Sequence, residues 1–330
     1  MMFVNAHTHL YSGLAPLGMP APDQPPRNFL QILERIWWRL DRALDEASLR
    51  AAARYYVAHA RRSGTVALVD HHESPGFIDG SLDVLADACA EFGVAAVVCY
   101  GATERNGGPE EGRRGLEECR RFIRSNHRPG VVGVVGLHAS FTVSDATIRL
   151  AGTLCRELST VLHVHVAEDV ADVQDARQRG YAGPLQRLMA LGALPAGSIL
   201  AHGVHLSADE VAQASDAGCW FVHNPRSNRA NHVGYPRGLT ASAKVALGTD
   251  GFPSDMRDEA LALAESSAEA GERASAVAGR LDAGWRVVSE RLTLTRAQIE
   301  AAAAVEISDG KLGAIDADAR EQAARVWARW

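Results

Sequence analysis

The sequence predicts an α/β fold, a TIM-like (β/α)8 barrel. Eight short apolar segments alternate along the 330 residues with longer segments of helical periodicity. Most of the apolar segments are nearly continuous Val, Ala, Leu and Ile, which is typical of parallel strands covered by helices on both faces. The chain lacks the G-x-G-x-x-G loop that would favour an open doubly wound sheet. We therefore expect the strands to close into a barrel.

The predicted strands end at residue 247. They cover residues 3–6, 65–69, 94–100, 131–137, 161–166, 198–201, 219–222 and 245–247. Helices are predicted at residues 28–44, 45–62, 81–91, 112–125, 147–158, 169–179, 184–191 and 207–217. The first helix carries an apolar stripe that includes Phe29, Leu33 and Trp37. Five prolines between residues 15 and 27 predict a stiff segment over the barrel mouth.

The rest of the chain has no clear strand pattern. Helical periodicity covers residues 257–291, 295–304 and 316–330. We therefore divide the chain into a barrel of residues 1–258 and a helical C-terminal extension, residues 259–330, packed on the barrel.

Composition excludes several classes of function. The net charge of −6 gives no electrostatic argument for nucleic-acid binding, and no apolar run approaches the roughly 20 residues of a membrane span. The five cysteines have no CxxC spacing, which predicts buried free thiols. Residues 1–7 lack the basic start and apolar run of a secretory signal. These features predict a cytoplasmic protein, and the arginine- and alanine-rich composition is typical of a bacterial one.

Histidines mark the predicted strand ends. His7 and His9 follow the first strand, His165 ends the fifth, His202 ends the sixth and Asp250 follows the eighth. Barrel active sites lie at the C-terminal strand ends, and residues i and i+2 of a strand point to the same face. Three imidazoles and one carboxylate with an open position suit Zn²⁺ or Fe²⁺ bearing a water. Each element alone is weak evidence, but the four together predict one metal site.

Nine segments of the sequence resemble the amidohydrolase superfamily. The motifs are HTH at 7–9, HVHVAE at 163–168, AHGVHLS at 201–207, HNPRSN at 223–228 and LGTDG at 247–251. They are most similar to its aminohydrolase/chlorohydrolase branch, which includes cytosine, guanine and S-adenosylhomocysteine deaminases. NAHTHLYSGLA at 5–15, LERIWWRLDRAL at 33–44, DHHESPG at 70–76 and GLHASFTVS at 136–144 resemble SsnA-like aminohydrolases more closely still. The resemblance covers about residues 1–258.

The resemblance implies a role for each strand-end residue. His7, His9, His165 and Asp250 would hold one divalent metal ion, with Zn²⁺ expected over Fe²⁺. Glu168 would shuttle protons as a catalytic residue, and Asp250 would take a proton from the attacking water. His202 would stabilise the charge that develops in the tetrahedral state.

Further histidines are candidates for substrate binding. His138, at the end of the fourth strand, aligns with a family position that usually faces substrate, and His223 is expected to line the pocket. His71 and His72 end the second strand, and we assign the substrate-facing role to His72. His163 is expected in the core. The two lysines, Lys244 and Lys311, lie outside the fourth strand, so the carboxylated lysine of the family's binuclear members has no counterpart and we expect one metal.

The sequence departs from the family at both ends of the barrel. The small β-sandwich of the relatives is expected to be absent or vestigial, with residues 310–316 as a remnant of its C-terminal motif. The predicted function is hydrolytic deamination of an amino-substituted N-heterocycle such as a purine, pterin or pyrimidine. Hydrolysis of another C–N or C–Cl bond at the same site, or a truncated non-catalytic relative, are the alternatives. The expected partners are this small substrate and a second copy of the chain in a homodimer.

Overall fold

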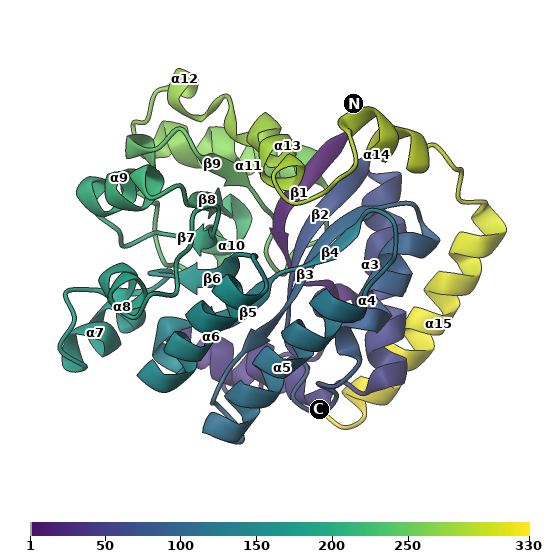
Figure 1. Cartoon of the computed structure of the whole chain (residues 1–330). Coiled ribbons are helices and arrows are strands. Elements are labelled where there is room, and N and C mark those ends of the chain that lie inside the picture. The colour runs from purple at the N-terminus through teal and green to yellow at the C-terminus, as the bar shows by residue number, and fades with distance from the viewer. Residues whose placement is uncertain (1) are drawn as a thin grey trace.

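A computed structural model describes residues 2–330 and shows a barrel of parallel strands ringed by helices (Figure 1). All nine strands belong to one sheet: β1 Phe3–Thr8, β2 Thr65–His72, β3 Ala95–Ala102, β4 Val131–Gly133, β5 Val135–Ala139, β6 Leu162–Val166, β7 Ile199–His202, β8 Trp220–His223 and β9 Val245–Leu247. Their order is β1-β2-β3-β5-β6-β7-β8-β9, with β4 paired to β3. A parallel bridge between Thr8 and Asp250 brings the first and last strands together. The predicted (β/α)8 barrel is confirmed.

The predicted fourth strand is divided in the structure. β4 and β5 are separated at Val134, yet both pair with β3 in one continuous register, from Ala96 with Val131 to Ala102 with Leu137. The two pieces therefore occupy a single strand position in the barrel. β6 takes the fifth strand position, as the sequence predicts.

Helices cover the outside of the sheet. They are α3 Glu46–Arg62, α4 Ser81–Glu91, α5 Pro109–Ser125, α6 Asp145–Glu157, α7 Val170–Gln178, α8 Pro184–Ala190, α9 Ala208–Asp216 and α10 Pro225–Ala230. Among residues 2–330, no helix combines the length and the apolar character that a bilayer crossing requires. The five cysteines are free and buried, as predicted.

The segment between β1 and α3 forms a cover over the strand ends. After the short helix η1, Leu10–Leu14, the chain passes through the proline-rich loop and enters α1 Phe29–Ile32. A π-helical turn, η2 Leu33–Trp37, joins α1 to α2 Trp38–Ala43, so the single helix predicted here contains one wider turn. Such π-turns occur often at functional sites, and this one presents Trp37 toward the strand ends.

The C-terminal region differs from the predicted helices. One long helix was expected at residues 257–291, but the structure has three: α11 Met256–Glu269, α12 Ala274–Val277 and α13 Arg280–Ser289. The chain turns at Gly271, which has a left-handed φ of 71° that a helix cannot continue through. α13 packs on β1 and β9, where Gly284 lies directly over Val4.

Two more helices follow, α14 Arg296–Ala302 and α15 Asp309–Trp327. The side chain of Ser308 caps α15, so this helix begins before the predicted residue 316. Residues 310–316, expected as a remnant of a sandwich motif, are therefore helical. α15 packs along α3 (Figure 1). The division of the chain at residue 258 stays a prediction.

Candidate metal centre and substrate pocket

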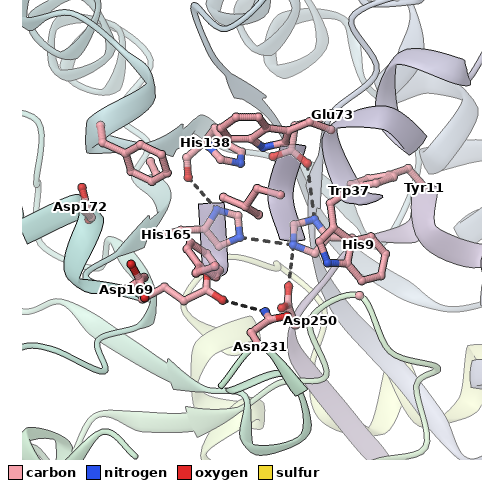
Figure 2. A pocket seen from close by; sticks show the side chains of 17 residues that line it. His9, Tyr11, Trp37, Glu73, His138, His165, Asp169, Asp172, Asn231 and Asp250 are labelled. Atoms are coloured by element: carbon pink, nitrogen blue, oxygen red, sulfur yellow. Dashed lines mark hydrogen bonds and ion pairs between the residues drawn. The ribbon is translucent and has the colours of Figure 1, made fainter. Parts of the chain in front are cut away.

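The strand ends bring the predicted metal ligands together. His9 Nε2 lies 2.8 Å from Asp250 Oδ1 and 3.3 Å from His165 Nε2, and Figure 2 shows these three side chains pointing toward one another. His7 Nε2 lies 3.4 Å from Asp250 Oδ1. His7 and His165 lie in β1 and β6, His9 directly follows β1, and Asp250 lies in the turn after β9. They meet because the C-terminal strand ends of a barrel lie at one face.

The donor atoms fit a cation. His7, His165, His202 and Asp250 each offer one atom, and these four atoms lie within 4.8 Å of one another. His9 is outside that set but contacts two of its members. His7 Nε2 is buried without a hydrogen-bond partner, which is costly unless a further group accepts its lone pair or its proton. Three imidazoles and a carboxylate around one point are a donor set that suits Zn²⁺ or Fe²⁺.

Outer contacts orient the imidazoles. His165 Nδ1 donates to the His138 carbonyl at 2.6 Å, and His9 Nδ1 donates to the His71 carbonyl at 2.5 Å. His7 Nδ1 lies 2.9 Å from Nε2 of His163, the buried histidine that the sequence places in the core. Each contact uses Nδ1 of a predicted metal ligand and leaves Nε2 of the same ring free to face the centre, as metal-ligating histidines require.

Burial and charge set the protonation of the centre. Burial lowers the pKa of His7 to about 3 and that of His165 well below its usual value, so both rings are neutral. Burial alone would raise the pKa of Asp250, but the His7 and His9 imidazoles hold it well below the usual range. For His9, burial lowers the pKa while the Asp250 carboxylate raises it, with a net rise to about 9. Near neutral pH His9 therefore carries a proton that faces the ionised Asp250 carboxylate, and a cation that binds His9 must displace it.

Backbone geometry at the centre is strained. His202 and Asp250 have left-handed φ angles of 71° and 54°, which non-glycine residues rarely adopt. Gly248 precedes Asp250, and a Cβ there would lie 2.7 Å from the His7 carbonyl oxygen. Only a glycine lets the last strand approach β1 closely enough for Asp250 to reach the histidines.

Glu168 and His202 lie together beside the centre. Glu168 Oε2 is 3.6 Å from His202 Nε2, and Asn231 Nδ2 donates to Glu168 Oε1 at 3.1 Å. His202 Nδ1 lies 2.9 Å from Asn228 Oδ1, which directs Nε2 toward the reacting side. Burial raises the pKa of Glu168 to about 7, so this carboxyl can hold a proton near neutral pH.

A pocket opens above the centre and is drawn in Figure 2. The empty space of the pocket, including the part that is open to solvent, is about 620 Å³. One side is apolar, formed by Phe29, Leu33, Trp37, Trp38 and Phe141. The polar residues of the lining are His9, Tyr11, Glu73, His138, His165, Glu168, Asp169, Asp172, Asn231 and Asp250.

Two of the three predicted substrate contacts are corrected by the structure. His138 lines the pocket, but His72 and His223 do not. β2 continues to His72, so alternation turns His71 toward the centre and His72 away, where its Nε2 meets Ser74 Oγ at 2.8 Å. His223 Nδ1 lies 2.9 Å from the Arg280 guanidinium of α13 and accepts its N–H.

Several site residues are missing from the sequence-based set. Glu73, Asn228 and Asn231 follow strands β2 and β8, and the motifs DHHESPG and HNPRSN contain the first two of them. Ser227 donates to the second carboxylate oxygen of Asp250. For Glu73 the signal was its place directly after β2, since barrel sites are built at strand ends. Ser227 and Asn228 lie in α10 and Asn231 at its C-terminal end, the first helix after β8.

Comparison with known proteins identifies the family. The model of the Amidohydrolase family matches residues 3–289. The chain belongs to the amidohydrolase family. Among curated proteins, this amidohydrolase is 28% identical over 269 residues to the 8-oxoguanine deaminase of Pseudomonas aeruginosa, covering 76% of the chain and 59% of that protein. It is 30% identical over 271 residues to the 5'-deoxyadenosine deaminase of Methanopyrus kandleri, covering 78% of the chain and 58% of that protein. The amidohydrolase thus spans less than two thirds of the length of these relatives.

Solved structures share the fold. An adenosine deaminase from Xanthomonas campestris, described with bound zinc, superposes with a TM-score of 0.77 at 22% identity, covering 98% of this chain and 85% of that one. The guanine deaminase of Escherichia coli gives a TM-score of 0.75 at 18% identity, covering 87% and 68%. These likenesses support the barrel architecture of this amidohydrolase.

Proposed function

We propose that this amidohydrolase is a mononuclear metal-dependent aminohydrolase that deaminates an amino-substituted N-heterocycle. The observation that carries the proposal is the convergence of His7, His9, His165 and Asp250 beneath a pocket that Glu168 also lines. The relatives named as deaminases support the reaction class.

His7, His9, His165 and Asp250 would hold the cation. When bound, it makes a water molecule acidic enough to serve as the nucleophile near neutral pH. Asp250 would take a proton from this water with its carboxylate. Ser227 donates to the same carboxylate and holds it in place.

Glu168 moves protons on the substrate side. In its protonated form it donates to the ring nitrogen next to the amino-bearing carbon, which makes that carbon more electrophilic. His202, held by Asn228, faces the oxygen on which negative charge develops. Glu168, now ionised, takes the proton of the hydroxyl that the water has added and delivers it to the amino group. The C–N bond breaks, ammonia leaves, and the heterocycle keeps oxygen in place of nitrogen. The proton that Asp250 took from the water restores the acid form of Glu168 for the next turnover.

The pKa of Glu168 favours an amine over a halide as leaving group. Ammonia must receive a proton to depart, whereas chloride leaves as the anion without one. A buried carboxyl with a pKa of about 7 supplies that proton at neutral pH. Hydrolysis of a C–Cl bond would not require the proton that the Glu168 carboxyl holds.

Ammonia release tests the proposal. The metal-loaded protein is incubated with a panel of amino-purines, amino-pyrimidines and pterins, with and without a chelator. We expect release from at least one compound, its loss on chelation, and a decrease of about 10²- to 10⁴-fold in Glu168→Gln. Absence of release across the panel with one metal bound would reject deamination.

The proposal extends to the metal, the compartment and the assembly. We expect Zn²⁺ over Fe²⁺, because the donor set suits tetrahedral zinc and the Xanthomonas campestris structure is described with zinc. Five buried free thiols support a reducing, cytoplasmic location in a bacterium. We expect a homodimer. Elemental analysis and sedimentation of the purified chain test the metal and the assembly.

A further inference from the structure

Glu73 is a pocket residue that the proposed mechanism does not use. It follows β2 and lines the pocket beside His138, on the side of His9 that faces away from Asp250 (Figure 2). Its side chain is only 2% exposed. The carboxylate is seated over Gly101 of β3, where a Cβ would lie 2.4 Å from Oε1. The glycine thus leaves the space that the Glu73 carboxylate occupies.

One oxygen of the Glu73 carboxylate is paired within the described part of the chain and the other is not. Oε1 lies 2.8 Å from His71 Nδ1. Burial alone would raise the pKa of Glu73, but this ion pair lowers it and keeps the carboxylate ionised. Oε2 lies 3.6 Å from His9 Nδ1, beyond hydrogen-bond reach. A buried, ionised carboxylate with one oxygen free of donors can accept further N–H or O–H groups there.

Orienting His9 does not account for Glu73. His9 Nδ1 already donates to the His71 carbonyl at 2.5 Å, so the ring is fixed without the carboxylate. With Oε1 paired to His71, Oε2 is the oxygen left to meet a molecule bound in the pocket that Glu73 lines.

The charge of the lining agrees with a ligand that donates hydrogen bonds. Glu73, Glu168 and Asp250 line the pocket, and the lining contains no lysine or arginine. Asp169 and Asp172 also line it, although their carboxylates accept hydrogen bonds from Ala171 and from Ser140 and Ala167. The nearby guanidinium of Arg105 stacks on Trp38 and pairs with Asp41 at 2.8 Å. The pocket therefore disfavours anions and favours neutral or cationic groups.

We propose that Glu73 anchors the substrate by accepting hydrogen bonds from N–H groups other than the amino group that is lost. The preferred substrates are accordingly flat heterocycles with a second N–H-bearing group, neutral or cationic, held between the Glu73 carboxylate and the aromatic side of the pocket. This inference rests on the proposed deaminase function.

Matched pairs of compounds test the anchor. The pairs are 2,6-diamino-9-methylpurine with 9-methyladenine, and 2,4-diaminopyrimidine with 4-aminopyrimidine. The members of each pair differ by one amino group, and the second member has no N–H beyond the amino group that is lost. The readout is the ratio of kcat/KM for ammonia release within a pair, together with binding by calorimetry. Wild-type protein should prefer the diamino member, and in Glu73→Gln this ratio should fall by about 10- to 100-fold. Glu73→Asp, which keeps the charge, should retain part of the preference.

The ratio separates an anchor from a structural role. A general loss of folding or of metal lowers both rates and leaves the ratio unchanged, and elemental analysis checks the metal. Asp79→Asn is the matched control, since it removes one carboxylate from the same loop at a side chain that is 70% exposed. Its ratio should equal that of the wild type.

The outcomes distinguish this inference from the proposed function. If the wild type deaminates but the ratio is the same in Glu73→Gln, the anchor is rejected and the function stands. If no compound is deaminated but the diamino members bind more tightly and lose that advantage in Glu73→Gln, the function is rejected and the anchor stands. A wild type without any preference for diamino compounds, in rate or in binding, overturns the inference.

Discussion

His9 Nε2 and Asp250 Oδ1 lie 2.8 Å apart, although one residue follows the first strand of the barrel and the other follows the last. This contact exists only when the barrel closes. Folding therefore assembles the metal centre, and the centre should in turn stabilise the closed barrel, because a ligand that binds only the folded state adds to its free energy of unfolding.

The first prediction concerns this coupling. Zinc at about 100 times its Kd should raise the free energy of unfolding by about 2.7 kcal/mol, measured as an increase in Tm. Asp250→Asn should remove most of the increase, because it weakens the ligand that joins the two ends of the sheet. Asp309→Asn, at a side chain 98% exposed on α15, is the matched control and should keep it. An equal zinc response in all three proteins would contradict the assigned centre.

The second prediction concerns His163, which contacts His7 from below the centre at 2.9 Å. His163→Phe keeps an aromatic ring but removes the nitrogen that fixes the His7 tautomer. Metal affinity should fall by about 10- to 100-fold, as for other outer contacts of metal-bound histidines. Competition with a chromophoric chelator measures it. Unchanged affinity in a folded variant would show that His163 only fills the core.

The third prediction concerns pH. A raised pKa means that Glu168 keeps its proton up to about pH 7 and loses it above, so kcat should decrease as pH rises through this value. Asn231 donates to the ionised form of Glu168 and holds its pKa down. Asn231→Leu should therefore raise the pKa and move the decrease in kcat to higher pH. A pH profile with the same midpoint in both proteins would remove Glu168 from the role of acid.

Sequence patterns located the strands and most of the centre for definable reasons. Buried parallel strands are continuous apolar runs, and His7, His165 and Asp250 stand where those runs end. His72 was misplaced because β2 runs three residues beyond its predicted end, and side-chain alternation cannot be assigned without the true end. His223 was misplaced because its partner, Arg280, lies on a distant helix that the pattern could not orient.

Loop residues were the least predictable part of the site. Glu73 lies in the loop after β2 and Asn231 at the C-terminal end of α10, and their roles depend on what the barrel brings opposite them. For Glu73 this is Gly101 of the neighbouring strand, and for Asn231 it is Glu168 from across the mouth. Such pairs become visible only in three dimensions.

The last prediction concerns the close approach at Gly248. A methyl group at this position would lie 2.7 Å from the His7 carbonyl oxygen and 2.8 Å from its amide nitrogen, and neither backbone atom can move without shifting β1. Gly248→Ala should lower the free energy of unfolding by about 1–3 kcal/mol, as overpacking does in a tight core. Because the clash is with a metal-ligand residue, metal affinity should fall as well.

Gly313→Ala is the control. Gly313 lies on α15 with no atom near the added methyl group, and the substitution should be neutral or stabilise the helix by up to about 1 kcal/mol. Denaturant unfolding with and without zinc separates the two effects, and a Gly248→Ala variant that matches wild type in both would show that the last strand can approach β1 without a glycine.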